Sequence, residues 1–397
     1  MEVVPSDVPV ADPSKAQISH VLRDVASFAY PEMFQLIKAQ CLPISNCLKC
    51  VDQYSRVDEI IVGLEFHHDK SEIVDISFFG NEWSKKIQKN IMPEWWAEIE
   101  KICLESSGHS GDFGGSLFSS NDSSSGRLIT HATSTLQLRG DHIIECEARN
   151  GQISVAGIFI PLSHEIHEDA QPVFSSVFDV VLEIQRAQSE SSIKHQNGFK
   201  SLISSLVQVL GEPVNLGVMV GRPQDLKLIF DCLKSPVDIR KALGDEYCIN
   251  LPAEFLNQVN SAVLGLLKVS NITFRLCLDI NSQRAAIAPR FCFEIFPLQV
   301  ISETRNWFVL DQLADIFGLT MSATLHVRSV HQHLPIGQKL DARLVDMMQG
   351  RFDFSQKMVS KHEYQQAAVL SHYKICLEPG KDSTIKSYAY VKQCLSD

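Results

Sequence analysis

A seven-residue stretch near the C-terminus carries the side chains best suited to chemistry. Residues 385–391 read IKSYAYV, and successive side chains point to opposite faces of a β-strand. Lys386, Tyr388 and Tyr390 therefore share one face, while small and apolar residues share the other. A lysine beside two phenols is suited to holding an anion next to a positive charge that develops on carbon.

Other predicted strands also set an apolar face against a mixed, charged one. Sorting their residues by parity places Arg275, Arg290, Lys374 and Glu65 on the mixed faces. A face that is simply solvated would more often hold lysine, glutamate and threonine. Arginine, lysine, tyrosine and glutamate together favour a shared polar interior.

Each of these residues also has an ordinary structural interpretation. Lys374 and Lys386 could be surface lysines that guard an edge strand against aggregation. The two tyrosines could be half-buried strand aromatics. Arg275 could pair with a neighbouring carboxylate purely as structure, and Glu65 could be a solvated strand carboxylate.

Five predicted β-hairpins separated by helices must position these strands. The second hairpin has Asn150-Gly151 between two alternating runs, which is a strong turn signal. The paired strands are expected at residues 59–66 and 73–79, 142–148 and 153–160, 214–220 and 226–231, 272–280 and 289–296, and 370–377 and 385–391. Helical segments are expected at residues 14–40, 94–104, 170–189, 198–210, 236–243, 252–268 and 303–317.

Hairpins separated by helices do not form the alternation of a parallel sheet, so an antiparallel α+β fold is expected. An open sheet with water on its mixed face is one arrangement that fits. A closed barrel with a polar lumen is the other, and about ten strands approach the limit at which open sheets curl. We therefore expect five helix-flanked antiparallel β-hairpins to close into a ten-stranded barrel with helices outside.

The composition predicts one soluble domain after a short disordered N-terminal segment. Residues 1–15 are expected to be a disordered lead-in and residues 16–397 a single barrel domain, with a flexible Ser/Gly-rich loop at 106–127. The net charge of −11 argues against a nucleic-acid partner. No apolar run is long enough to span a membrane and no signal peptide is visible, so a cytoplasmic location is expected.

The cysteines and histidines show no recognisable metal or redox motif. Eleven scattered cysteines fit reduced thiols, and Cys277, Cys292 and Cys376 are expected to be small hydrophobes in strands. The pair at 47 and 50 lacks a second Cys-x-x-Cys, and the histidines at 326, 331 and 333 are expected to be solvated in a loop. Phosphate-binding glycine loops and a nucleophile elbow are also absent from the sequence.

The predicted barrel and the Lys386-x-Tyr388-x-Tyr390 strand resemble the ABBA-type aromatic prenyltransferases over about residues 58–393. That resemblance implies transfer of an allylic prenyl group from a diphosphate donor to an aromatic small molecule or a peptide side chain. It implies that Arg275, Arg290, Lys374 and Lys386 bind the diphosphate, that the two tyrosines shield the allylic cation, and that Glu65 is the general base.

Metal dependence and an alternative function stay open at this point. Mg²⁺ often assists the departure of a diphosphate, but the chain has no Asp-Asp-x-x-Asp motif. No protein-held metal site is predicted. The alternative function is a non-enzymatic α+β scaffold that binds a peptide or protein partner, and an unrelated enzyme acting on another anionic substrate would use the same cavity.

Overall fold

A computed structural model describes residues 30, 33, 35, 37, 59–69, 73–79, 143–149, 152–161, 196–211, 213–219, 225–231, 251–281, 284–297, 307–332 and 366–394. These residues contain ten strands and four helices. In chain order they are β1 (Glu59–His67), β2 (Val74–Phe79), β3 (Ile143–Arg149), β4 (Gln152–Pro161), α7 (Gln196–Leu210), β5 (Pro213–Met219), β6 (Asp225–Phe230), α9 (Ala253–Leu266), β7 (Ile272–Asn281), β8 (Ala286–Pro297), α11 (Phe308–Phe317), α12 (Met321–His331), β9 (Gln366–Leu377) and β10 (Thr384–Cys394).

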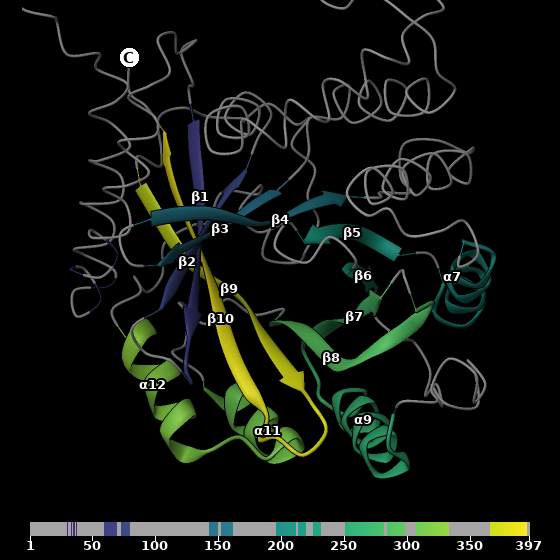
Figure 1. The fold of residues 1–397 in the computed structure, drawn as a ribbon. Helices are drawn as coiled ribbons and strands as arrows, with labels where there is room; N and C mark the ends of the chain where they lie inside the picture. The colour runs from purple at the N-terminus through teal and green to yellow at the C-terminus, as the bar shows by residue number, and fades with distance from the viewer. Residues whose placement is uncertain are drawn as a thin grey trace, which may run out of the picture.

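The strands pair with their sequence neighbours, and every pairing is antiparallel. The first and last strands also pair with each other, so the sheet closes in the order β1-β10-β9-β8-β7-β6-β5-β4-β3-β2 (Figure 1). Along this seam Val62 lies opposite Val391 and Glu65 lies opposite Tyr388. The curled antiparallel sheet predicted from the five hairpins is therefore confirmed.

The outward face of the sheet is apolar because it packs against helices. Phe255 of α9 contacts Phe291 of β8 with ring centroids 5.7 Å apart, and Phe317 of α11 contacts Phe293 at 5.4 Å. The other outward residues of β7 and β9 join the same buried cluster: Phe274, Leu276, Leu278, Ile280, Tyr373, Ile375 and Leu377. The parity sorting of these strands is confirmed.

Helices α11 and α12 are joined by a short, well-defined connection. Gly318 follows α11 with φ 62°, a left-handed conformation that glycine adopts without a side-chain clash. The hydroxyl of Thr320 then accepts a hydrogen bond from the backbone N–H of Ala323 at 3.2 Å and caps α12. The Ser383 hydroxyl donates to the Phe317 carbonyl at 2.7 Å and ties the β9–β10 turn to the end of α11.

Helix α12 corrects the prediction that the histidines lie in a solvated loop. His326 and His331 lie on this helix, and His331 is only 3% exposed. The helix forms because Thr320 caps it and because Val327 and Val330 bury a stripe against the barrel. Position 333 lies outside the described residues.

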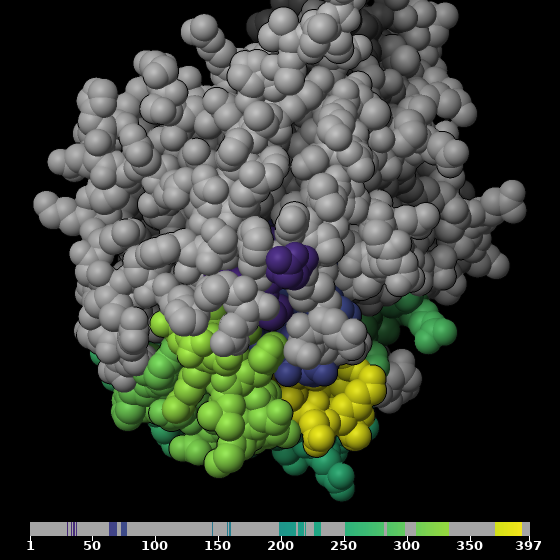
Figure 2. All heavy atoms as spheres, turned by 90° about the vertical axis from the view of Figure 1, so that its left-hand side faces the viewer, coloured from purple at the N-terminus to yellow at the C-terminus, as the bar shows by residue number. Residues whose placement is uncertain are grey.

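These two histidines meet the β1 and β10 strands on the outer surface of the barrel. The Ser387 hydroxyl lies 2.6 Å from His68 Nε2 and 2.7 Å from His331 Nε2, and His68 Nδ1 lies 3.0 Å from His326 Nδ1. Figure 2 shows α12 in yellow-green beside the β1–β2 hairpin in blue and the β9–β10 hairpin in yellow. The buried histidines thus fasten α12 to the strands that close the barrel.

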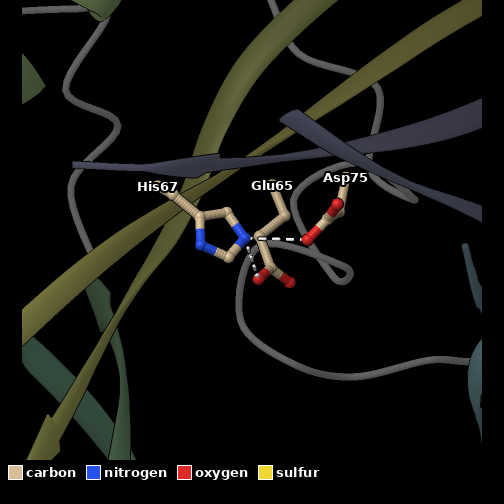
Figure 3. A group of neighbouring side chains, drawn as sticks. All are labelled: Glu65, His67 and Asp75. Atoms are coloured by element: carbon tan, nitrogen blue, oxygen red, sulfur yellow. Dashed lines mark hydrogen bonds and ion pairs between the residues drawn. The ribbon is translucent and has the colours of Figure 1, made fainter. Parts of the chain in front are cut away.

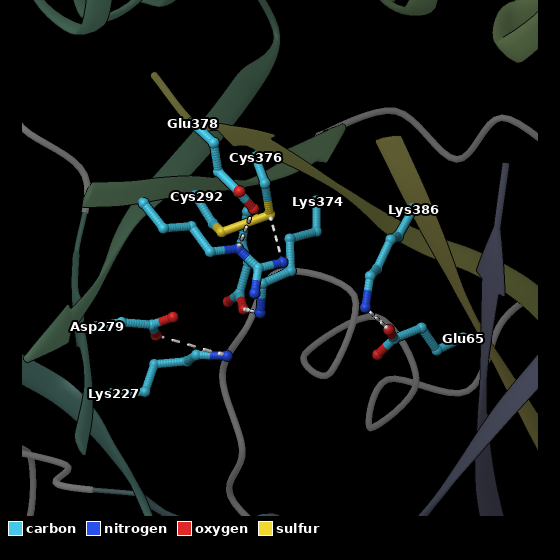
Figure 4. The surroundings of a disulfide bond; sticks show 10 residues. Glu65, Lys227, Asp279, Cys292, Lys374, Cys376, Glu378 and Lys386 are labelled. Atoms are coloured by element: carbon cyan, nitrogen blue, oxygen red, sulfur yellow. Dashed lines mark hydrogen bonds and ion pairs between the residues drawn. A yellow bond between two sulfur atoms is a disulfide. The ribbon is translucent and has the colours of Figure 1, made fainter. Parts of the chain in front are cut away.

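The structure also corrects the prediction that the strand cysteines are reduced. Cys292 of β8 lies directly opposite Cys376 of β9, with Cα atoms 4.1 Å apart, and the two form a disulfide (Figure 4). Side chains at directly opposite positions are close enough to bond, but spacing along the sequence does not reveal which cysteines face each other. Cys277, opposite Cys292 on β7, is a buried free thiol.

Several predicted segments lie outside the described residues and are not tested. They include residues 1–15, the Ser/Gly-rich loop at 106–127, the cysteines at 47 and 50, and the helical segments at 94–104, 170–189 and 236–243. Helices α7, α9 and α11 match three of the other predicted segments to within about five residues at each end. None of the four described helices has the length and hydrophobicity needed to cross a bilayer.

Candidate functional site

The mixed faces of the strands surround a cavity of about 550 Å³, measured together with its opening to solvent. Its described lining comes from eight of the ten strands, which only the interior of a barrel can bring together. The lining residues are Ser77, Glu145, Phe159, Asn215, Ile229, Glu294, Phe296, His372, Lys374, Tyr388 and Tyr390.

Lys374 enters the cavity as one half of a buried ion pair. It lies directly opposite Glu294, and its Nζ donates to Glu294 Oε1 at 2.9 Å. Burial disfavours both charges, but each stabilises the other. The ammonium therefore lowers the pKa of Glu294 to about 2, and Glu294 with nearby anions raises the pKa of Lys374.

Lys386 lies directly opposite Lys374 across β9 and β10, but its side chain points toward β1, whereas that of Lys374 points toward β8. The Lys386 ammonium contacts Glu65 on β1, and Figure 4 shows both lysines pointing toward the interior of the barrel. Burial of Glu65 opposes ionisation, but Lys386 and His67 outweigh it and hold the pKa of Glu65 well below its usual range. Glu65 is fully buried.

Glu65, His67 and Asp75 form a compact group beside this lysine (Figure 3). His67 Nε2 lies 2.7 Å from Asp75 Oδ2 and 3.2 Å from Glu65 Oε1. Burial opposes protonation of the imidazole, but its hydrogen bonds to the two carboxylates raise the pKa of His67. One imidazole and two carboxylates can ligate a divalent metal ion. Here Lys386 and His67 already contact the two carboxylates.

Three aromatic rings from adjacent strands line one wall of the cavity. His372 stacks on Tyr388 with centroids 4.2 Å apart and an interplanar angle of 9°, and Phe296 lies 4.6 Å from His372. Lys374 Nζ lies 5.9 Å from the centroid of the Tyr388 ring. Burial lowers the pKa of His372 to about 3, so its ring is neutral at pH 7. Tyr390 lines the same cavity, and burial raises the pKa of both phenols.

Of the two predicted arginines, Arg275 is buried and lies directly opposite Glu294 on the neighbouring strand. Arg275 Nε lies 3.5 Å from Asp231, and its guanidinium lies 5.2 Å from the centroid of Phe296. Arg290 Nε lies 3.4 Å from Glu378, and its Nη2 lies 3.6 Å from the sulfur of Cys376. Neither arginine is among the residues that line the cavity. The structure therefore brings together Lys374, Tyr388 and Tyr390, with Lys386 and Glu65 behind them.

Sequence reasoning missed two charged residues on the inner face, Lys227 and Glu145. Lys227 Nζ lies 3.9 Å from Asp279, and burial together with repulsion from Lys374 lowers its pKa. Glu145 lines the cavity from β3. Strand parity alone could have found both, because each alternates with apolar neighbours in its strand.

Comparison with known proteins gives similarity at the level of solved structures. No family model and no curated protein matches this chain. The apo form of the prenyltransferase PriB is 9% identical with a TM-score of 0.47, covering 94% of this chain and 95% of that chain. The NotF prenyltransferase is 11% identical with a TM-score of 0.46 and 96% coverage of both chains. The 5-dimethylallyltryptophan synthase from Streptomyces coelicolor is 9% identical with a TM-score of 0.48, covering 94% of this chain and 96% of that chain.

The resemblance to ABBA-type aromatic prenyltransferases that the sequence predicted is thus found again among solved structures. At identities near 10% and TM-scores below 0.5, no function follows from it for this chain. A functional assignment therefore has to rest on the residues of the cavity.

Proposed function

We propose that this protein transfers an allylic prenyl group from its diphosphate to an aromatic small molecule or a peptide side chain. The observation that carries the proposal is the cavity itself, where a buried lysine lies beside two tyrosines and a stacked histidine. An allylic cation needs an anion-binding group on one side and aromatic faces that exclude water on the other. The cavity offers both.

Lys374 and Lys386 would bind the diphosphate. They are direct partners across two strands, so their backbones lie about 5 Å apart. An ammonium group has three N–H donors, and the carboxylate beside each lysine accepts only part of them. The remaining donors can reach phosphate oxygens and stabilise the charge that grows on the leaving group. Arg275 and Arg290 would add positive charge from positions outside the cavity lining.

In the proposed transfer step, atoms and charge balance. The bond between the allylic carbon and the diphosphate oxygen breaks, and its electron pair leaves with the diphosphate. The acceptor forms a new bond to the allylic carbon and releases a proton. Tyr388 and Tyr390 would shield the cation from water, and Glu65 is the base for the proton that the resemblance to prenyltransferases implies.

Mg²⁺ bound to the diphosphate and a cytoplasmic location remain predictions. So does the complete ring of helices of an ABBA barrel, of which the described residues include four helices. A single barrel domain over residues 16–397 fits the closure of the sheet between β1 and β10.

Titration calorimetry with dimethylallyl, geranyl and farnesyl diphosphate tests the proposal. We expect one of these donors to bind, and Lys386→Ala to weaken its binding about 10-fold or more, because a charge-assisted hydrogen bond is lost. Lys386→Arg should retain most of the affinity. Lys381→Ala is the matched control, since Lys381 lies on an exposed turn and its side chain is 70% exposed. Absence of binding by all three donors would end the proposal.

A non-enzymatic scaffold is the second candidate function. Large apolar side chains are exposed on the helices that cover the barrel, with Phe308 57%, Met321 78% and Leu325 56% exposed. Exposed apolar groups on one side of a protein can form a docking surface for a partner. Under this alternative, substitution of Met321 and Leu325 by serine would abolish partner binding, whereas Lys386→Ala would have no effect on it.

A further inference from the structure

We propose that Glu145 on β3, rather than Glu65, is the group that accepts the proton from the prenyl acceptor. This inference rests on the proposed prenyl transfer and assigns one further catalytic residue to it. It follows from a comparison of the carboxylates on the inner face of the barrel. They differ in access to the cavity and in the cations that hold them.

Glu145 has direct access to the cavity. It is among the lining residues, and its two neighbours across the strands are small. Ser77 lies opposite it on β2, and Gly157 lies opposite it on β4, where a register shift follows Glu145. Gly157 has no side chain, and a Cβ atom there would lie 3.2 Å from the sulfur of Met219. The residues paired with Glu145 are therefore small, and the Met219 side chain packs over Gly157.

Glu65 lacks this access. It is fully buried, it is not among the lining residues, and both Lys386 and His67 contact the same oxygen, Oε1. The other oxygen of Glu65, Oε2, is buried without a hydrogen-bond partner among the described residues, and Glu65 does not line the cavity through it either. Glu65 is therefore better placed to hold Lys386 in position than to accept a proton.

The other inner carboxylates are held by cations. Glu294 pairs with Lys374 at 2.9 Å, Asp279 lies 3.9 Å from Lys227, and Asp75 lies 2.7 Å from His67. Within the described part of the chain, no ion pair within 4 Å involves Glu145. Two carboxylates line the cavity in that part of the chain, Glu145 and Glu294. Glu294 forms an ion pair with Lys374, and Glu145 forms none with a described lysine, arginine or histidine.

The electrostatic surroundings agree with this assignment. Burial, followed by repulsion from Glu65, raises the pKa of Glu145 to about 7. A general base works best when its pKa lies near the working pH, because it is then both partly ionised and basic enough. The pKa of Glu294, about 2, makes that carboxylate a much weaker base.

In the proposed step the proton leaves the acceptor atom as that atom bonds to the allylic carbon. The electron pair of the broken carbon–oxygen bond stays on the diphosphate. The Glu145 carboxylate becomes a neutral carboxylic acid, which then returns the proton to water through the opening of the cavity. No oxidant or reductant takes part.

Glu145→Gln tests the assignment, with Glu65→Gln for comparison and Glu254→Gln as the matched control. Glu254 is an exposed residue in the first turn of α9, outside the barrel. We expect Glu145→Gln to bind the prenyl diphosphate within about threefold of the wild-type affinity and to lower kcat about 100-fold or more, in the range of lost general-base catalysis. The rise of kcat/KM with pH near 7 should disappear in this variant and persist in Glu65→Gln.

The outcomes separate this inference from the function on which it rests. If the wild type transfers prenyl groups and Glu145→Gln retains its kcat or its pH dependence, the assignment is wrong and the proposed function stands. If the wild type neither binds nor transfers any donor, both are overturned. ¹³C NMR of glutamate carboxyls in the resting wild type gives an independent readout. A carboxyl that titrates near pH 7 and is missing in Glu145→Gln supports the assignment, and its absence in the wild type contradicts it.

Discussion

The strand parity of single residues predicts which face they occupy but not which partner they meet. Lys374, Tyr388 and Tyr390 line the cavity as the alternation indicated. Their neighbours could not be predicted, because Lys386 meets Glu65 from 321 positions away and Lys374 meets Glu294 from 80 positions away. Such pairs depend on the register between strands, which the alternation of a single strand does not contain.

Replacing Lys374 by methionine should destabilise the fold because it leaves Glu294 buried without a counter-charge. Removing one partner of a buried ion pair costs about 3–5 kcal/mol, whereas replacing both partners by apolar residues is often close to neutral. We therefore expect Lys374→Met to lower the free energy of unfolding in urea by that amount. The double variant Lys374→Met, Glu294→Leu should recover most of the loss.

Lys381→Met is the control for this experiment, since an exposed pair contributes little to stability. Equal stability of the single and double variants would show that Lys374 and Glu294 are not coupled in the folded protein.

At the scale of elements, the sequence predicted the hairpins better than it predicted helix α12. The hairpins were visible because turn residues separate alternating runs, as at Asn150-Gly151. In α12 the polar residues concealed a narrow buried stripe of Val327, Val330 and His331. His331 is buried because Ser387 of β10 satisfies its Nε2, a contact between positions 56 residues apart.

The buried histidine on α12 should make stability depend on pH in a defined window. Burial, assisted by His326, lowers the pKa of His331 to about 3 from an unfolded value near 6.5. Between these values the unfolded chain binds a proton that the folded chain does not, so the free energy of unfolding falls as the pH decreases. The slope is about 1.4 kcal/mol per pH unit for one proton.

Urea titrations between pH 7.5 and 4 measure this slope in the wild type and in His331→Gln. We expect the slope of the free energy of unfolding against pH to be smaller in the variant by about the contribution of one proton. Glutamine can still contact Ser387 but does not titrate. An unchanged slope in His331→Gln would mean that His331 is protonated in the folded state or reached by water.

For the whole molecule, the order of elements was predictable and the cross-links between distant strands were not. Alternating hairpins and helices indicated an antiparallel curled sheet, and the structure closes it by pairing β1 with β10. The disulfide between Cys292 and Cys376 joins positions 84 residues apart. It was not predicted, because the spacing of the cysteines along the chain does not indicate which of them pair. The register between strands determines both the pairing of β1 with β10 and the disulfide.

Reduction of the Cys292–Cys376 disulfide should weaken the barrel. It restricts an 84-residue segment of the unfolded chain, and loss of such a cross-link typically costs about 2–5 kcal/mol. We expect dithiothreitol to lower the free energy of unfolding by this amount in the wild type. The variant Cys292→Ala, Cys376→Ala should be insensitive to it. A non-reduced proteolytic digest without a peptide pair joined through these cysteines would contradict the cross-link.

The pairing of β10 with both β1 and β9 has a consequence for biosynthesis. A nascent chain emerging from the ribosome holds the first nine strands before residues 384–394 are available, so it carries two open edges until β10 has been translated. The exposed edges of β1 and β9 can pair with strands from other chains. A premature stop codon just upstream of β10 should therefore direct the product into inclusion bodies or to cellular proteases.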